Sequence, residues 1–142
     1  MRLLLASAVL LLGASDAFAA EPPGVCITEP ARVVHLDRAR LKAALASSLD
    51  KHEAPTKLIW IPAAHAQARL PDCDVVVRVG IRGRRRRATL DFATTFRGVA
   101  GLPLVQEVGP IDLSRIDPRS FGRVWTRLLA QWQRDAVTRL DD

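Results

Sequence analysis

The sequence predicts an α+β domain: a mostly antiparallel sheet with two amphipathic helices packed on it, in the order β-α-β-β-β-β-α. Residues 75–82 and 88–97 alternate apolar and polar side chains with period two, which is typical of strands that face a core on one side. Apolar residues recur at helical spacing in residues 41–49 and again in residues 121–140. Because a one-sided sheet and one-sided helices bury their apolar surfaces against each other, these patterns predict one layered domain.

The chain begins with the features of a secretory signal peptide. Arg2 gives a basic start, the apolar run Leu3–Gly13 follows, and Ala17 and Ala19 are small residues suited to a cleavage site. The apolar run is too short to span a bilayer. We therefore expect residues 1–19 to be a signal peptide cleaved after Ala19, and the protein to be periplasmic or secreted.

The alternatives to a cleaved leader are a retained anchor and a lipoprotein. A retained signal would give a single N-terminal anchor, although the small residues at the cleavage site favour removal. Acylation requires a cysteine directly after the apolar run, whereas Cys26 lies well beyond it. No later segment reaches the roughly eighteen apolar residues of a membrane span, so no integral span is expected after processing. The rest of the chain divides into an N-terminal arm, residues 20–30, and a single domain, residues 31–142.

The first half of that domain predicts a strand, a helix and a strand. Residues 31–36 are a short β-type run, and Asp37 offers an N-cap oxygen to a helix starting at Arg38. Pro55 ends any continuation of that helix. Residues 57–62 are β-branched and aromatic, which predicts a buried strand.

The second half predicts a three-stranded meander and a closing helix. Residues 75–82 and 88–97 form a hairpin around a tip at residues 83–86, and a strand at 104–108 extends it. Asp117 and Pro118 supply an N-cap and a proline at the first helical position. The apolar stripe of the final helix, which should lie across the meander, comprises Phe121, Val124, Trp125, Leu128, Leu129, Trp132, Ala136, Val137 and Leu140.

The two cysteines, Cys26 and Cys73, predict a disulfide. A small, even number of cysteines in an exported protein is typical of a disulfide bond. A metal site is the weaker alternative, because two cysteines without a CxxC or CxxH partner make a poor zinc shell. The bond would fasten the N-terminal arm to the domain.

Five arginines lie at the predicted hairpin tip: Arg82, Arg84, Arg85, Arg86 and Arg87. Together with a net charge of +6 they predict contact with an anionic partner, because guanidinium groups grip phosphate and carboxylate bidentately. An exported protein rarely meets nucleic acid, and the aromatic residues that stack on bases are absent here, so no nucleic-acid partner is expected. The expected partners are an envelope protein or an anionic envelope component. The alternative is a solvated tip whose like charges discourage edge-to-edge pairing of strands.

No catalytic, metal or cofactor site is expected from the sequence. His35, His52 and His65 stand in no HExxH or related spacing, and Ser47-Ser48 lie within a helix without a GxSxG turn. A small hydrolase assembled from dispersed histidines and carboxylates stays open as an alternative. So does a small-ligand binder, in which an outward-facing Trp60 would mark a binding groove.

The hairpin resembles those of small bacterial envelope domains. The matching stretches are Asp74–Gly80, where an aspartate and apolar residues open the hairpin, and Leu90–Gly101, where the second strand leads into a glycine-containing turn. The resemblance is to the N-terminal domain of the Tol–Pal propeller protein and to the curli-secretion lipoprotein, although the lipobox of the lipoprotein members is missing. It implies a non-enzymatic envelope adaptor and assigns no functional residues.

Overall fold

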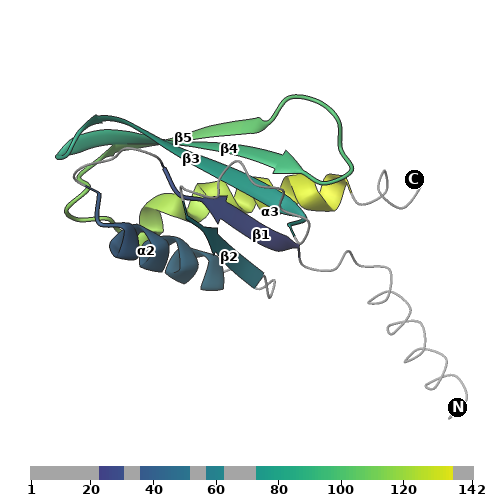
Figure 1. The fold of residues 1–142 in the computed structure, drawn as a ribbon, viewed down its shortest axis with the longest axis horizontal. Coiled ribbons are helices and arrows are strands. Elements are labelled where there is room, and N and C mark those ends of the chain that lie inside the picture. The colour runs from purple at the N-terminus through teal and green to yellow at the C-terminus, as the bar shows by residue number, and fades with distance from the viewer. Residues whose placement is uncertain (1–22, 31–35, 52–56, 63–72, 136–142) are drawn as a thin grey trace, which may run out of the picture.

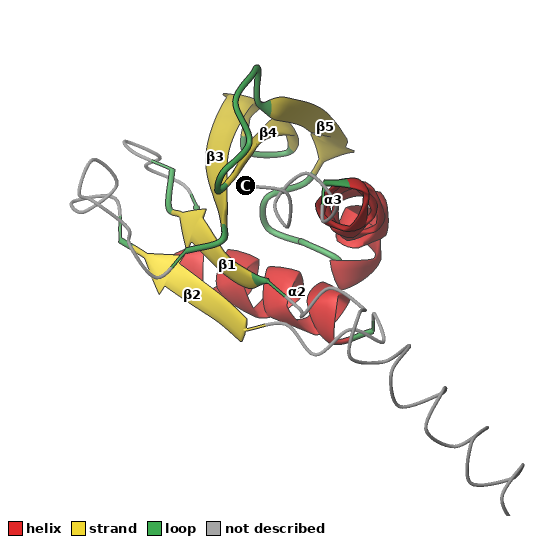
Figure 2. Cartoon of the chain, turned by 90° about the vertical axis from the view of Figure 1, so that its right-hand side faces the viewer, coloured by secondary structure: helices red, strands yellow, loops and turns green. Residues whose placement is uncertain are grey.

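A computed structural model describes residues 23–30, 36–51, 57–62 and 73–135 and shows one five-stranded sheet with helices packed on one face (Figures 1 and 2). The sheet has the strand order β2-β1-β3-β4-β5. The predicted order β-α-β-β-β-β-α is confirmed in part, because the first strand is formed by other residues than predicted. The elements are β1 (Gly24–Thr28), α2 (Arg38–Asp50), β2 (Lys57–Ile61), β3 (Val75–Arg84), β4 (Arg87–Phe96), β5 (Leu104–Ile111), the 3₁₀ helix η2 (Pro118–Phe121) and α3 (Gly122–Arg134).

The sheet is mixed, which corrects the prediction of a mostly antiparallel one. β1 runs parallel to both of its neighbours, β2 and β3, while β3, β4 and β5 form the predicted antiparallel meander. The parallel pairing of β1 with β2 follows from the helix α2 between them, because a crossover connection returns the chain to the same end of the sheet.

The first strand lies earlier in the chain than predicted. Residues 24–28, assigned from the sequence to an N-terminal arm, form β1 near the centre of the sheet, so the domain includes this segment. Of the strand predicted at 31–36, residues 31–35 lie outside the described residues, and Leu36 is not in a strand. Every residue of Val25–Thr28 is buried, so β1 shows none of the period-two alternation that marks a half-exposed strand.

Both predicted helices are present and bury their apolar faces. The Asp37 carboxylate accepts a hydrogen bond from the Arg40 N–H at 3.0 Å, which confirms the predicted N-cap of α2. Asp117 caps η2 instead of an α-helix, and α3 begins only at Gly122. The buried residues Phe121, Val124, Trp125, Leu128 and Trp132 confirm the central part of the predicted stripe. Pro55 and the stripe residues Ala136, Val137 and Leu140 lie outside the described residues.

The core fills the space between the helices and one face of the sheet. β3 and β4 contribute alternate residues to it, and both helices contribute their buried stripes. From β5, the partly buried Val108 and Ile111 pack against it. Its largest fully buried side chains are Trp125, Phe92, Phe121, Ile27, Leu41, Leu45, Leu90 and Leu128. The described residues include no helix that is long and apolar enough to cross a membrane.

The β3–β4 hairpin turns more tightly than predicted. Arg84 pairs with Arg87, so the turn comprises only Arg85 and Arg86, and Gly83 lies within β3. Gly83 has a φ of +96°, and a Cβ there would lie 2.7 Å from the carbonyl oxygen of Arg87. Glycine is needed at this position because any larger residue would meet both backbone strain and a clash.

Candidate functional site

The disulfide between Cys26 and Cys73 is confirmed. Cys26 lies in the middle of β1 and Cys73 just before β3, with their Cα atoms 5.6 Å apart and both residues buried. The bond crosses between two neighbouring parallel strands. It therefore fastens a strand inside the sheet to the meander, instead of fastening a loose arm as the sequence suggested.

Trp60 faces the helices. It is the register partner of Ile27 in the parallel β1–β2 pair, and residues paired in this way lie on the same face of a sheet. Ile27 is fully buried in the core, and Trp60 packs partly buried against the same core. The structure thus gives no support for an outward-facing groove at this tryptophan.

The histidines that could build a hydrolase site, His35, His52 and His65, lie outside the described residues. Among the residues that the structure does describe, no three His, Cys, Asp or Glu side chains gather in a way that could hold a metal ion. The candidate site that the structure builds is therefore the arginine-rich end of the β3–β4 hairpin.

Four of the five predicted arginines form what we call the arginine tip, Arg84–Arg87. All four residues are exposed, and none of their guanidinium groups forms a hydrogen bond or ion pair with another described residue. The tip itself is held in place, because the Arg85 carbonyl accepts a hydrogen bond of 2.8 Å from the N–H of Leu113, a buried residue after β5. The arrangement places four exposed positive charges on a fixed turn.

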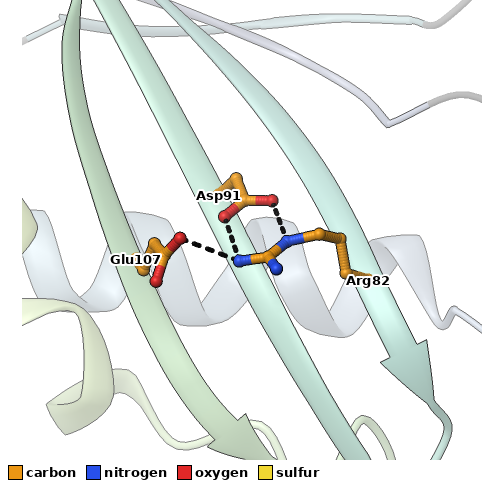
Figure 3. Close-up of polar contacts among 3 residues, drawn as sticks. All are labelled: Arg82, Asp91 and Glu107. Carbon is orange, nitrogen blue, oxygen red and sulfur yellow. Dashed lines mark hydrogen bonds and ion pairs between the residues drawn. The ribbon is translucent and has the colours of Figure 1, made fainter.

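Arg82, the fifth predicted arginine, differs from the tip because two carboxylates hold it. Its Nε and one terminal nitrogen donate to both oxygens of Asp91 on β4, at 2.7 and 3.1 Å, and the same terminal nitrogen donates to Glu107 on β5 at 2.8 Å (Figure 3). These hydrogen bonds, with the charges of both carboxylates, raise the pKa of Arg82 above its ordinary value. Its charge is compensated locally, which distinguishes Arg82 from the four arginines of the tip.

The two carboxylates that bind Arg82 were not predicted from the sequence. The signal was present in the hairpin pattern, since Arg82 and Asp91 lie at polar positions of the two alternating strands. In the observed register Arg82 is opposite Thr89, so Asp91 is its diagonal neighbour on the same face. Glu107 could not be placed without the register of β5.

Asp112 lies beside the tip, in the turn after β5. Its carboxylate accepts hydrogen bonds from the hydroxyl and the N–H of Ser114, and these bonds hold the pKa of Asp112 below its ordinary value, with smaller contributions from the charges of Arg115 and Arg86. The carboxylate therefore stays ionised near the base of the tip. It anchors the turn that presents Leu113 to Arg85.

Two surface depressions adjoin these charges. One, of about 370 Å³, lies beside the tip and is lined by Arg82, Gly83, Arg87, Thr89 and Pro110. The other, of about 200 Å³, lies between β5 and α3 and is lined by Gln106, Glu107, Val108, Ser120, Arg123, Val124 and Arg127. The depression beside the tip therefore combines the guanidinium groups of Arg82 and Arg87 with the hydroxyl of Thr89.

Comparisons of the chain with models of protein families, with curated proteins and with solved structures find no significant match. The function must therefore be inferred from the residues of this chain.

Proposed function

We propose that this protein is exported to the bacterial cell envelope and acts there as a non-catalytic interaction module, which binds anionic envelope components through the arginine tip. The predicted signal peptide supports export. The buried disulfide is compatible with it, because disulfides form and persist in oxidising compartments. The resemblance of the hairpin to envelope adaptor domains favours the same role.

The observation that carries the proposal is the contrast between Arg82 and the tip. Arg82 is compensated by Asp91 and Glu107, whereas Arg84–Arg87 have no ion-pair partner among the described residues. Like charges crowded on a turn repel one another and give a strong local positive potential. An anionic surface would relieve that repulsion and would be gripped bidentately by guanidinium groups. The absence of aromatic residues in Arg82–Arg87 continues to argue against a nucleic-acid partner.

The test is binding of the oxidised protein to vesicles that contain phosphatidylglycerol, compared with vesicles of phosphatidylcholine alone. We expect binding only to the anionic vesicles, and weaker binding as salt is added. Replacement of Arg84, Arg85, Arg86 and Arg87 by glutamine should lower the affinity by up to about a thousandfold, since each basic residue near an anionic surface contributes about 1 kcal/mol and every step of about 1.4 kcal/mol is tenfold. The melting temperature should hardly change, because the four side chains are exposed and unpaired.

The matched control replaces four other exposed arginines with glutamine, one on β3 outside the tip and three on α3: Arg78, Arg123, Arg127 and Arg134. Both variants lose four positive charges, so a difference between them reports position and not net charge. Retained binding in the control would support the tip as the contact surface. Equal losses in the two variants would show that overall charge drives binding, and undiminished binding of the tip variant would contradict the proposal.

A further inference from the structure

The pocket beside the arginine tip opens on the face of the sheet opposite the helices. Thr89, one of its lining residues, lies between Ala88 and Leu90, which are both fully buried in the core. Because side chains alternate across a strand, Thr89 points to the other face. Its register partner Arg82 lies on that face as well, with the Asp91 and Glu107 carboxylates (Figure 3).

A bulge in β5 shapes this pocket. The β4–β5 register passes from Leu90↔Val108 to Ala88↔Ile111, so Gly109 and Pro110 oppose Thr89 alone. A Cβ on Gly109 would lie 2.8 Å from the Ala88 carbonyl oxygen and 2.9 Å from the Thr89 Cα, so the backbones approach as closely as glycine allows. Pro110 of the bulge and Gly83 of β3 both line the pocket.

The lining offers hydrogen-bond donors from three residues. The Asp91 and Glu107 carboxylates accept hydrogen bonds from Nε and one terminal nitrogen of Arg82, which fixes the plane of the guanidinium group. The other terminal nitrogen of Arg82 makes no hydrogen bond to a described residue. Arg87 has no ion-pair partner among the described residues, and Thr89 adds a hydroxyl. An arginine that is oriented in advance loses less side-chain entropy when it binds an anion.

We propose that this pocket binds a single phosphate group of an envelope phosphate ester, an inference that rests on the proposed function and specifies its ligand. Donors contributed by three residues suit a tetrahedral oxyanion, whereas a carboxylate presents only two oxygens in one plane. A pocket of about 370 Å³ is at the small end of ligand sites, which fits one headgroup. The arginine tip attracts the anionic surface, and the pocket selects the phosphate.

The test follows backbone amide signals by NMR while glycerol 1-phosphate is added to the oxidised protein. We expect saturable shifts at Gly83 and Thr89, and much smaller shifts with acetate at the same ionic strength. Thr89→Val removes the hydroxyl without changing charge and should weaken phosphate binding about tenfold, as should Arg87→Gln. Equal responses to acetate and phosphate, or no shifts at the pocket, would overturn the assignment.

Matched controls come from the same hairpin. Thr95→Val alters an exposed threonine on the same face of β4 but far from the pocket, and Arg85→Gln removes a tip charge that does not line it. Both should keep phosphate affinity within about twofold of the original protein. If they weaken binding as much as the pocket variants do, the phosphate is held by general charge and the pocket proposal is wrong.

A last experiment distinguishes lipid headgroups from soluble esters as the source of the phosphate. It also shows whether the pocket proposal can fail while the proposed function holds. Vesicles with phosphatidylglycerol are titrated against the original protein and Thr89→Val. Weaker vesicle binding by Thr89→Val means that lipid headgroups enter the pocket, whereas unchanged vesicle binding with a loss for glycerol 1-phosphate means that the pocket takes soluble esters. If glycerol 1-phosphate causes no shifts while the tip variant still loses vesicle binding, the pocket proposal fails and the proposed function stands.

Discussion

Among the polar groups buried in the described part of the chain, Gln106, Thr94 and Trp125 differ in whether they find a hydrogen-bond partner. Gln106 on β5 donates from its side-chain amide to the Val124 carbonyl in α3 at 3.2 Å. The hydroxyl of Thr94 and the indole N–H of Trp125 are both buried and have no hydrogen-bond partner among the described residues. An unsatisfied buried polar group costs about 1–3 kcal/mol, so these two atoms lower the stability of the folded state.

Replacing Thr94 by valine should therefore stabilise the protein. The substitution exchanges the unsatisfied hydroxyl for a methyl group of similar size, and we expect the free energy of unfolding to rise by about 1 kcal/mol. Urea denaturation measures the change. Thr95→Val, at the exposed neighbouring position, should leave stability within about 0.5 kcal/mol. A lower stability of Thr94→Val would show that the hydroxyl does have a partner.

At the scale of elements, β5 is an edge strand that tolerates a proline because of its bulge. The sequence predicts this strand over residues 104–108. The strand instead continues to Ile111, and the Gly109–Pro110 peptide bond is cis. The bulge lets the backbone pass the proline without losing the pairing of Ile111 with Ala88.

Gly109→Ala tests the importance of this bulge. The added Cβ would meet backbone atoms of Ala88 and Thr89 at less than 3.0 Å, and backbone cannot rotate away as a side chain can. We expect the substitution to lower the free energy of unfolding by about 1–3 kcal/mol.

Gly122→Ala is the matched control for that substitution, measured by the same urea denaturation. A Cβ at Gly122 meets nothing within 4 Å, and its backbone is helical, so alanine there should be neutral or stabilising by up to about 1 kcal/mol. If Gly109→Ala is as well tolerated as Gly122→Ala, the close approach of β5 to β4 is not needed for the fold.

The elements predicted correctly are those with a strong local pattern. The hairpin alternates along both strands, and α2 and α3 carry clear apolar stripes, so each could be located from its own residues. β1 has no such pattern, because it is buried on both sides and short. Its parallel pairing also depends on contacts with β2 and β3, which a local pattern does not encode.

The candidate site was predicted in composition but not in arrangement. The arginines, the turn, and the pairing of Cys26 with Cys73 could be located because each is defined by residue type and spacing. The compensation of Arg82 and the pocket at Thr89 depend on the register of three strands and on the β5 bulge. Contacts between side chains on different strands depend on how the strands pair, and the sequence of one strand alone does not predict that pairing.

Across the whole molecule, the disulfide joins the two parts of the sheet. β1 and β2 form the parallel half, β3 to β5 form the antiparallel half, and the Cys26–Cys73 bond spans the boundary between them. The two cysteines are 47 residues apart, so the bond restricts a long loop in the unfolded chain. In the chain-entropy account, closing a loop of this length stabilises the fold by about 4 kcal/mol.

Removal of the bond by the double replacement of Cys26 and Cys73 with alanine should lower the free energy of unfolding by about 4 kcal/mol. Urea denaturation of the variant and of the oxidised original protein measures the difference. Addition of reductant should lower the stability of the original protein toward that of the variant and leave the variant unchanged. A variant as stable as the oxidised protein would show that the sheet holds its two halves together without the crosslink.

The position of β1 inside the sheet sets the order in which the chain can fold when it is exported as proposed. The N-terminal end crosses the membrane first, and Gly24–Thr28 is therefore among the earliest mature segments to arrive. Its hydrogen-bond partners, Lys57–Ile61 and Val75–Arg84, arrive only later. In such an export, β1 would stay apolar and unpaired until both of its neighbours had followed it. Under that proposal, the sheet can close around β1 only after β2 and β3 have also been exported.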